Sequence, residues 1–129
     1  MSKGEINYPT EAELQILKVL WKRGASTVRE VHDVLNQVRP MLYTTVLKIM
    51  QIMTEKGLVK RDLLQRAHIY EANVEESQTQ QQLVGDLLEK VFDGSASQLV
   101  MRALSNKKAS KEEISEIRKI LDNFEQGKK

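Results

Sequence analysis

Three hydroxyl side chains stand next to one another in this sequence, and a lysine and a glutamine follow them at helical spacing. These residues are Tyr43, Thr44, Thr45, Lys48 and Gln51. Hydroxyl, ammonium and amide groups donate or accept hydrogen bonds, and in proteins they bind phosphate oxygens and the edges of nucleic-acid bases. The group therefore indicates recognition by hydrogen bonding. The same side chains also occur on ordinary solvent-exposed helices, which is the alternative at this point.

The stretch that positions these residues, 41–57, is predicted to be a helix because its apolar residues recur at helical spacing. At 3.6 residues per turn, one face collects Leu42, Val46, Ile49, Met50 and Met53. The opposite face collects Thr44, Lys48, Gln51 and Glu55. The helix therefore has one buried side and one polar, mildly basic side. A recognition helix that enters the major groove of DNA has this profile.

Basic residues gather around the predicted helix. Residues 1–73 hold eleven basic and eight acidic residues, a net charge of +3, whereas residues 74–129 hold nine and ten, a net charge of −1. The segment 39–66 alone has a net charge of +4, and its basic residues are Arg39, Lys48, Lys56, Lys60, Arg61 and Arg66. A local basic patch is the electrostatic signature of a nucleic-acid surface, although many solvated surfaces resemble it.

Two shorter helices are predicted before this one. The segment Thr10–Glu13 has the capping-box pattern, and its helix should end near Arg23-Gly24, where glycine can adopt a left-handed conformation. The segment Thr27–Glu30 repeats the pattern and starts a helix that should end around Asn36. Pro40 then separates that helix from 41–57. Two short helices joined by a tight turn, with the second polar on its outer face, form a helix-turn-helix arrangement.

After Gly57 the pattern becomes alternating, which predicts two strands at 58–63 and 68–72. Residues 64–67 would connect them as a hairpin. Three helices followed by a hairpin are the order of a winged helix. Lys60 and Arg61 would lie on the first strand and Arg66 at the tip of the wing, where they can contact phosphates.

Residues 74–129 predict three amphipathic helices with few aromatic residues, which make a poor core by themselves. Pairing with a second copy would bury their apolar stripes, so a homodimer is expected. The alternative is that these helices pack on the winged helix of their own chain. The residues expected to dimerise are the apolar ones of the three stripes: Leu83, Leu87, Leu88, Val91, Phe92, Leu99, Val100, Leu104, Ile114, Ile117, Ile120, Leu121 and Phe124. The predicted domains are 1–73, which would bind DNA, and 74–129, which would dimerise.

Several classes of function find no support in the sequence. It contains no cysteine, which excludes disulfides and thiolate zinc sites. No segment approaches the roughly eighteen apolar residues that span a membrane, and no apolar leader is present, so a cytoplasmic protein without a membrane partner is expected. His32 and His68 are the two histidines, and neither lies in a metal or nucleophile motif. With no glycine-rich phosphate loop either, neither enzyme activity nor a cofactor or metal is expected.

Together, these segments resemble the penicillinase-repressor family of bacterial transcription factors (BlaI/MecI type). Similar segments occur in the same order and at the same spacing along nearly the whole chain: Thr10–Glu13 with Leu17–Trp21, Val28–Val31, Tyr43–Val46, Glu55–Leu58, Arg66–Tyr70 and Ser110–Ile114. In that family an N-terminal winged helix binds a dyad-symmetric operator and a C-terminal helical region dimerises. The regulated genes often encode β-lactam resistance. The resemblance implies that Thr44 and Thr45 begin the recognition helix and that Arg66 is the arginine of the wing.

The chain also departs from the family pattern. Leu47 and Ile52 stand where relatives commonly have basic residues, and Lys48 stands where a small hydroxyl residue is usual. Relatives are inactivated by a sensor-linked protease that cuts an Asn-Phe bond, which makes a sensor or protease an implied partner. The aligned position here reads Arg102-Ala103, and Asn123-Phe124 lies outside that register, where Phe124 is expected to pack in a core. Without cysteine, the chain also lacks the motif of the copper-responsive branch.

The sequence thus predicts a mainly α-helical protein with an N-terminal winged helix-turn-helix and a C-terminal helical dimerisation region. The predicted function is that of a homodimeric repressor that binds an operator in double-stranded DNA. The DNA-binding residues would be Arg39, Tyr43, Thr44, Thr45, Lys48, Gln51, Lys60, Arg61 and Arg66. The alternative is a winged helix that docks onto another protein without specific DNA binding, since a fold does not determine a function.

Overall fold

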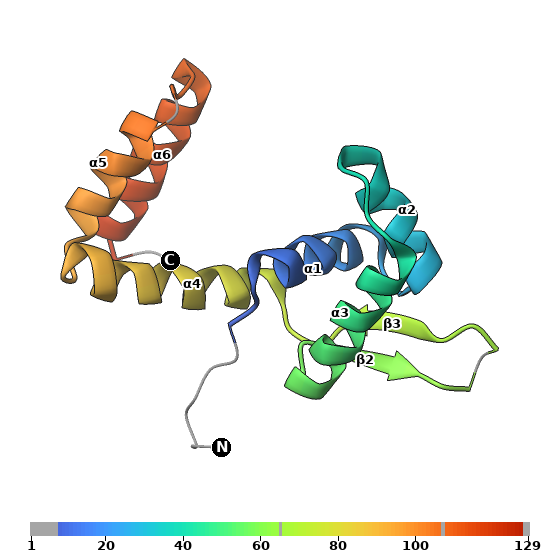
Figure 1. The fold of residues 1–129 in the computed structure, drawn as a ribbon. Coiled ribbons are helices and arrows are strands. Elements are labelled where there is room, and N and C mark those ends of the chain that lie inside the picture. The colour runs from blue at the N-terminus through green and yellow to red at the C-terminus, as the bar shows by residue number, and fades with distance from the viewer. Residues whose placement is uncertain (1–7, 65, 107, 128–129) are drawn as a thin grey trace. The chain divides into compact units, whose positions relative to one another are not determined.

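The computed structural model describes residues 8–64, 66–106 and 108–127, which form helices and three short strands (Figure 1). Gln65 of the predicted hairpin connection lies outside the described residues. In chain order, the elements are α1 (Glu11–Arg23), β1 (Ser26–Thr27), α2 (Val28–Val38), α3 (Tyr43–Lys56), β2 (Val59–Asp62), β3 (Ile69–Ala72), α4 (Glu76–Phe92), α5 (Ala96–Asn106) and α6 (Lys111–Glu125). The mainly α-helical fold with a winged helix-turn-helix at its N-terminal end is confirmed.

Both predicted capping boxes of the winged helix are present. The Thr10 hydroxyl accepts from the Glu13 amide at 3.2 Å, and the Glu13 carboxylate accepts from the Thr10 amide at 2.8 Å. Thr27 and Glu30 repeat this exchange at 3.1 and 2.9 Å. Two details of the prediction are wrong. Helix α2 continues to Val38 rather than ending near Asn36, and the residue after α1, Gly24, has φ 89° and ψ −166°, outside the left-handed helical region.

Helix α3 is shorter at its start than the predicted stretch 41–57. It begins at Tyr43 and ends at Lys56, and the C-cap residue Gly57 has a left-handed φ of 82°, which allows its amide to donate to the Met53 and Thr54 carbonyls. The predicted burial of Leu42 is wrong, because this side chain is 71 % exposed. Leu42 is the N-cap residue and has an extended backbone, so the helical periodicity does not apply to it. Val46, Met50 and Met53 are buried as predicted.

The two predicted strands pair as a hairpin, and a third strand joins them. β3 lies between β1 and β2, and both pairings are antiparallel. The prediction placed His68 in the second strand, but β3 begins at Ile69. β1 was not predicted, since its two residues, Ser26 and Thr27, are too few to show an alternating pattern.

A single apolar core holds these elements together. It consists of side chains from α1, α2, α3 and the hairpin: Ile16, Leu17, Val19, Leu20, Val28, Val31, Val46, Met50, Met53, Leu58, Val59 and Tyr70. Polar contacts add to it at two places. The Trp21 indole donates to the Val74 carbonyl at 2.9 Å, and Lys56 Nζ lies 2.7 Å from a carboxylate oxygen of Glu13. The latter ion pair connects the end of α3 to the start of α1.

The described chain divides into two compact units between Leu83 and Val84, inside α4. The functional boundary between residues 73 and 74 stays a prediction. Helix α4 begins at Glu76, so the run rich in glutamate and glutamine is itself helical. Ser110 caps α6 by accepting from the Glu113 amide at 3.0 Å.

No residue of α5 or α6 is buried, which agrees with the poor core expected there. The expectation that Phe124 packs in a core is wrong for the single chain, because the side chain is 66 % exposed. Val91, Ile120 and Leu121 are also more than half exposed. Among the residues that the structure describes, no helix is both long and apolar enough to cross a membrane.

Candidate nucleic-acid interface

One side of α3 presents polar side chains to solvent. Thr44, Thr45, Lys48 and Gln51 are all exposed, and the buried Val46, Met50 and Met53 occupy the other side of the helix. The exposed residues follow one another at intervals of one, three and three, so they span two turns on one side of the helix. Helix α3 therefore offers two hydroxyls, an ammonium and an amide along a single exposed strip.

Tyr43, the first residue of α3, is half-buried and held by side chains of α2. The Arg29 guanidinium carbon lies 4.8 Å from the centroid of the Tyr43 ring, which is the distance of a cation–π contact. The His32 ring approaches the same ring edge-on, with 6.1 Å between centroids and an interplanar angle of 66°. These contacts orient the tyrosine, and they also bring a guanidinium to the N-terminal end of the exposed strip.

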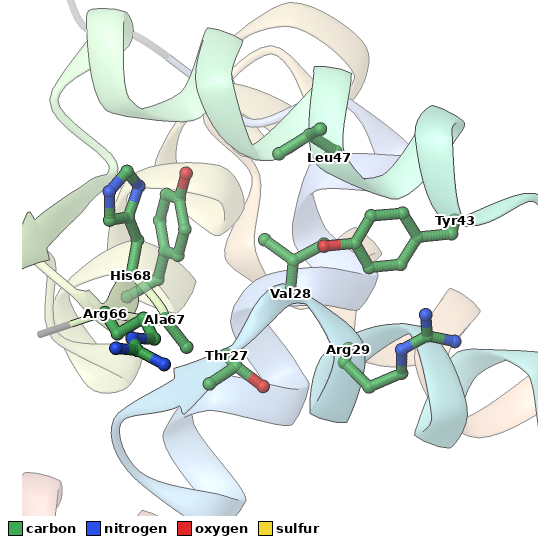
Figure 2. A pocket seen from close by; sticks show the side chains of 9 residues that line it. Thr27, Val28, Arg29, Tyr43, Leu47, Arg66, Ala67 and His68 are labelled. Carbon is green, nitrogen blue, oxygen red and sulfur yellow. The ribbon is translucent and has the colours of Figure 1, made fainter.

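A cavity of about 300 Å³ lies between the start of α2, the first turns of α3 and the hairpin (Figure 2). Its lining combines apolar side chains with cationic and hydroxyl groups: Thr27, Val28, Arg29, Tyr43, Leu47, Arg66, Ala67, His68 and Tyr70. No carboxylate is among these lining residues. Leu47 contributes to the apolar part of the lining.

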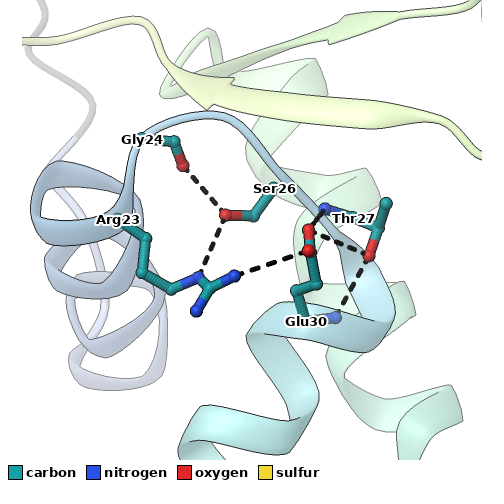
Figure 3. Close-up of polar contacts among 5 residues, drawn as sticks. All are labelled: Arg23, Gly24, Ser26, Thr27 and Glu30. Carbon is teal, nitrogen blue, oxygen red and sulfur yellow. Dashed lines mark hydrogen bonds and ion pairs between the residues drawn. The ribbon is translucent and has the colours of Figure 1, made fainter.

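A polar network fixes the start of α2, next to this cavity (Figure 3). Arg23 Nε donates to the Ser26 hydroxyl at 3.5 Å, and that hydroxyl donates to the Gly24 carbonyl at 2.9 Å. The Glu30 carboxylate accepts from the Thr27 amide and lies 3.4 Å from Arg23 Nη2. These contacts hold the Glu30 carboxylate and the backbone of β1 in place. They also define the position of the first turn of α2, which carries Arg29.

The sheet register separates the two basic residues of β2. Lys60 lies opposite Glu71, and Arg61 lies opposite Tyr70. Neighbouring residues of a strand point to opposite faces, and directly paired residues share a face. Arg61 therefore shares the face of Tyr70, which lines the cavity, whereas Lys60 shares the other face with an acidic residue. Arg66 is exposed at the cavity, and Arg39 is exposed at the C-cap of α2.

The sequence of this chain matches one known protein family over most of its length. The model of the penicillinase repressor family matches residues 9–123, which include the winged helix and most of the helical region. The chain belongs to the penicillinase repressor family. The resemblance seen in the sequence is therefore confirmed.

Individual members of the penicillinase repressor family are distant in sequence but similar in length. The penicillinase repressor of Bacillus licheniformis is 27 % identical over 120 residues, which cover 93 % of this chain and 94 % of that protein. The methicillin resistance regulatory protein MecI of Mammaliicoccus sciuri is 22 % identical over 113 residues, which cover 88 % and 92 % of the two chains. The solved structure of monomeric Bacillus licheniformis BlaI in complex with the blaP half-operator is 26 % identical, with a TM-score of 0.49, and covers 57 % of this chain and 89 % of that one.

Two residues that line the cavity were not among those predicted to bind DNA. They are Arg29 and His68, and His68 was assigned only to a strand, outside any metal or nucleophile motif. Arg29 was visible as the second residue of a helix that starts with a capping box, but its direction depends on how α2 packs on α3. The sequence signal for His68 was its spacing, because it lies two residues after Arg66 and two residues before Tyr70, and both of these residues line the cavity.

Proposed function

We propose that this protein is a transcriptional repressor that binds an operator in double-stranded DNA as a homodimer, with α3 in the major groove. Family membership over residues 9–123 is the observation that carries the proposal. The exposed strip of α3 supports it, because a helix must expose hydrogen-bonding groups to read base edges. A dyad-symmetric operator follows from the two-fold symmetry of a dimer, with half-site centres roughly 34 Å apart or a multiple of that distance.

Base reading is assigned to Thr44, Thr45, Lys48 and Gln51. Their exposure on two successive turns matches the length of helix that lies in a major groove. Lys48 and Gln51 carry the longer side chains of the four, and each good bidentate contact to a base discriminates by about 1 to 3 kcal/mol. The two threonines lie in the first turn, where short side chains suit a close approach to the DNA.

Phosphate binding is assigned to Arg39, Arg61 and Arg66, with Tyr43 and Arg29 at the mouth of the cavity. The cavity supports the assignment of Arg29 and Arg66, because these two guanidinium groups line it and no carboxylate does. The register favours Arg61 over Lys60, because Lys60 faces Glu71 across the sheet. This refines the sequence prediction, which included both residues.

The proposal is tested first by selecting a preferred duplex from a random pool with the full-length protein. The affinity for that duplex and for an unrelated one is then measured by fluorescence anisotropy at several salt concentrations. The expected result is nanomolar binding to a site with dyad symmetry and a steep decrease with salt. If no duplex is enriched, the protein is a docking module rather than a repressor.

Two substitutions then separate base reading from phosphate binding. Lys48→Ala should weaken binding to the selected duplex more than to the unrelated one, whereas an equal loss on both would make Lys48 a phosphate contact only. Arg61→Ala should reduce the slope of log affinity against log salt by roughly 1.8 for a dimer, since each phosphate contact contributes about 0.9. Lys60→Ala is the matched control on the same strand and should change the slope by less than half as much.

Dimerisation is assigned to the apolar stripes of residues 83–124. Solvent exposure in the single chain supports this assignment. More than half of the side-chain surface is exposed at four of these residues: Val91, Ile120, Leu121 and Phe124. Phe124→Lys should shift the protein from dimer to monomer in sedimentation experiments and weaken operator binding. Asn123→Lys adds the same charge one residue earlier, off the stripe, and should leave the dimer intact. A wild-type protein that sediments as a monomer at every concentration would refute the assignment.

The partner that ends repression is proposed to be a sensor or protease, as the family resemblance implies. The peptide bond aligned with the Asn-Phe cleavage site of relatives joins Arg102 to Ala103, inside α5. Cleavage here would therefore need a protease of different specificity.

β-Lactam resistance genes are the first places to search for the DNA site selected from the random pool. Mass spectrometry of the repressor before and after induction of those genes would show whether a cut occurs and where.

A further inference from the structure

The start of α3 is stabilised differently from the starts of α1 and α2. The latter two helices each begin with a complete capping box made by their own side chains. The N-cap residue of α3 is Leu42, which makes no side-chain capping hydrogen bond. Residues 39–42, which include Pro40, connect α2 to α3 and are called the turn below. The direction in which α3 leaves this turn must therefore be set by something other than a local cap.

Two side chains of α2 hold the backbone of this turn at Met41. The Met41 amide donates to the Asn36 side-chain carbonyl at 2.9 Å. The Met41 carbonyl accepts from His32 Nε2 at 2.8 Å. Nε2 is the donor in this contact because a carbonyl oxygen can only accept. Both polar groups of one peptide residue are thus bound by side chains that lie one helical turn apart on α2.

The same face of α2 also contacts the first residue of α3. Arg29, His32 and Asn36 are separated by three and four residues, so they lie along one side of the helix. Arg29 packs on the Tyr43 ring and His32 meets that ring at its edge, while His32 and Asn36 bind Met41. The His32 side chain is only 13 % exposed. Its environment is that of an enclosed structural contact between two helices.

We propose that His32 and Asn36 are positioning residues for operator recognition, because they fix the turn that aims the exposed strip of α3. The proposal rests on the proposed function, since it assigns these two residues a role in DNA reading. Neither side chain needs to touch DNA. Their effect reaches the bases through Met41, which lies three and four residues before Thr44 and Thr45.

The size of the effect follows from the strength of one hydrogen bond. When one of these two hydrogen bonds is lost, the turn samples other conformations. The apparent affinity for the operator then falls in proportion to the fraction of protein whose turn keeps the conformation that binds DNA. One net hydrogen bond changes such a fraction by roughly three- to tenfold. Binding to unrelated DNA tolerates small changes in helix direction, because phosphate contacts are less demanding in geometry than base contacts. The ratio of the two affinities should therefore fall.

The first experiment needs no DNA. Amide hydrogen exchange is measured by NMR at Met41, Thr45 and Val46, whose amides donate to the Asn36 side chain and to the Leu42 carbonyl, in the wild type, in His32→Ala and in Asn36→Ala. Both variants should accelerate exchange at these amides at least threefold, while the core amide of Met50 stays protected. Gln37→Ala, a change at an exposed neighbour on α2, is the control and should leave exchange unchanged. Asn36 is exposed, so its variant keeps the test decisive if His32→Ala does not fold.

The second experiment measures the ratio of affinities for the selected and the unrelated duplex. His32→Ala and Asn36→Ala should lower this ratio roughly ten- to a hundredfold, because both protomers of the dimer lose three- to tenfold. His32→Gln keeps an N–H donor and Asn36→Asp keeps an acceptor, so both variants should retain most of the wild-type ratio of affinities. A substitution that acted only by destabilising the fold would not depend on keeping the donor or the acceptor. Unchanged exchange in the alanine variants, or faster exchange with an unchanged ratio, would overturn the proposal. If the wild type prefers no duplex, the proposed function fails, and the exchange data still decide whether the two residues hold the turn.

Discussion

Leu42 offers a prediction that links the stability of α3 to its position on DNA. It occupies the N-cap position with φ −77° and ψ 141°, the extended conformation that a capping residue needs, but its side chain makes no capping hydrogen bond. Asparagine or serine at this position can accept from an amide of the first turn, which typically contributes about 1 kcal/mol. Leucine is 71 % exposed, so its replacement removes only roughly 0.6 kcal/mol of apolar burial. Leu42→Asn should therefore raise the free energy of unfolding by about 0.5 kcal/mol.

Aspartate at the same position adds a charge effect. Helix α3 has no acidic residue in its first turn, and a carboxylate there interacts favourably with the helix dipole by about 0.3 to 1 kcal/mol. Leu42→Asp should thus raise the free energy of unfolding by roughly 1 kcal/mol, or the melting temperature by about 4 to 8 °C. If α3 lies in the major groove, the same carboxylate repels the DNA backbone. At about 7 Å in water each repulsion is near 0.6 kcal/mol, so a dimer should bind roughly eightfold more weakly than Leu42→Asn.

The assay is thermal unfolding of the wild type, Leu42→Asn and Leu42→Asp, followed by anisotropy titrations with the selected duplex at low salt. Leu63→Asn is the control for stability, because Leu63 is 58 % exposed and lies outside any helix terminus. A Leu42→Asn variant that melts no higher than the wild type would mean that α3 does not begin at Tyr43. A Leu42→Asp variant that binds as tightly as Leu42→Asn would mean that the start of α3 is remote from the DNA.

Two further predictions concern the core and the ion pair. Met50 is fully buried, so Met50→Ala should lower the free energy of unfolding by about 2 to 5 kcal/mol, measured by urea denaturation with an unchanged m-value. Lys56→Ala should lower it by roughly 2 to 3 kcal/mol in the same assay, because the Glu13 carboxylate, 5 % exposed, loses its cation. Adding Glu13→Gln to Lys56→Ala should recover part of that loss, and a double variant less stable than Lys56→Ala would contradict the ion-pair explanation.

Local rules in the sequence were sufficient to predict most helices. The capping boxes at Thr10 and Thr27 depend on side chains three residues apart, and the apolar faces of the helices depend on spacings of three and four. Such interactions are made within one element, so they can be predicted without knowing how the elements pack. The same reason explains why the exposed side of α3, including Lys48 and Gln51, was predicted correctly.

Tertiary structure decided the features that depend on contacts between elements. The strand at Ser26 exists only because β3 pairs with it, and Lys60 and Arg61 were separated by the register of the hairpin. The direction of Arg29 was likewise set by packing of α2 on α3. Leu42 was predicted to be buried because periodicity was extended one residue beyond the true start of the helix. The sequence by itself therefore determined the helices and the hairpin, the family and the polar strip, whereas the turn that aims this strip was determined by hydrogen bonds from α2, whose partners are brought together only by folding.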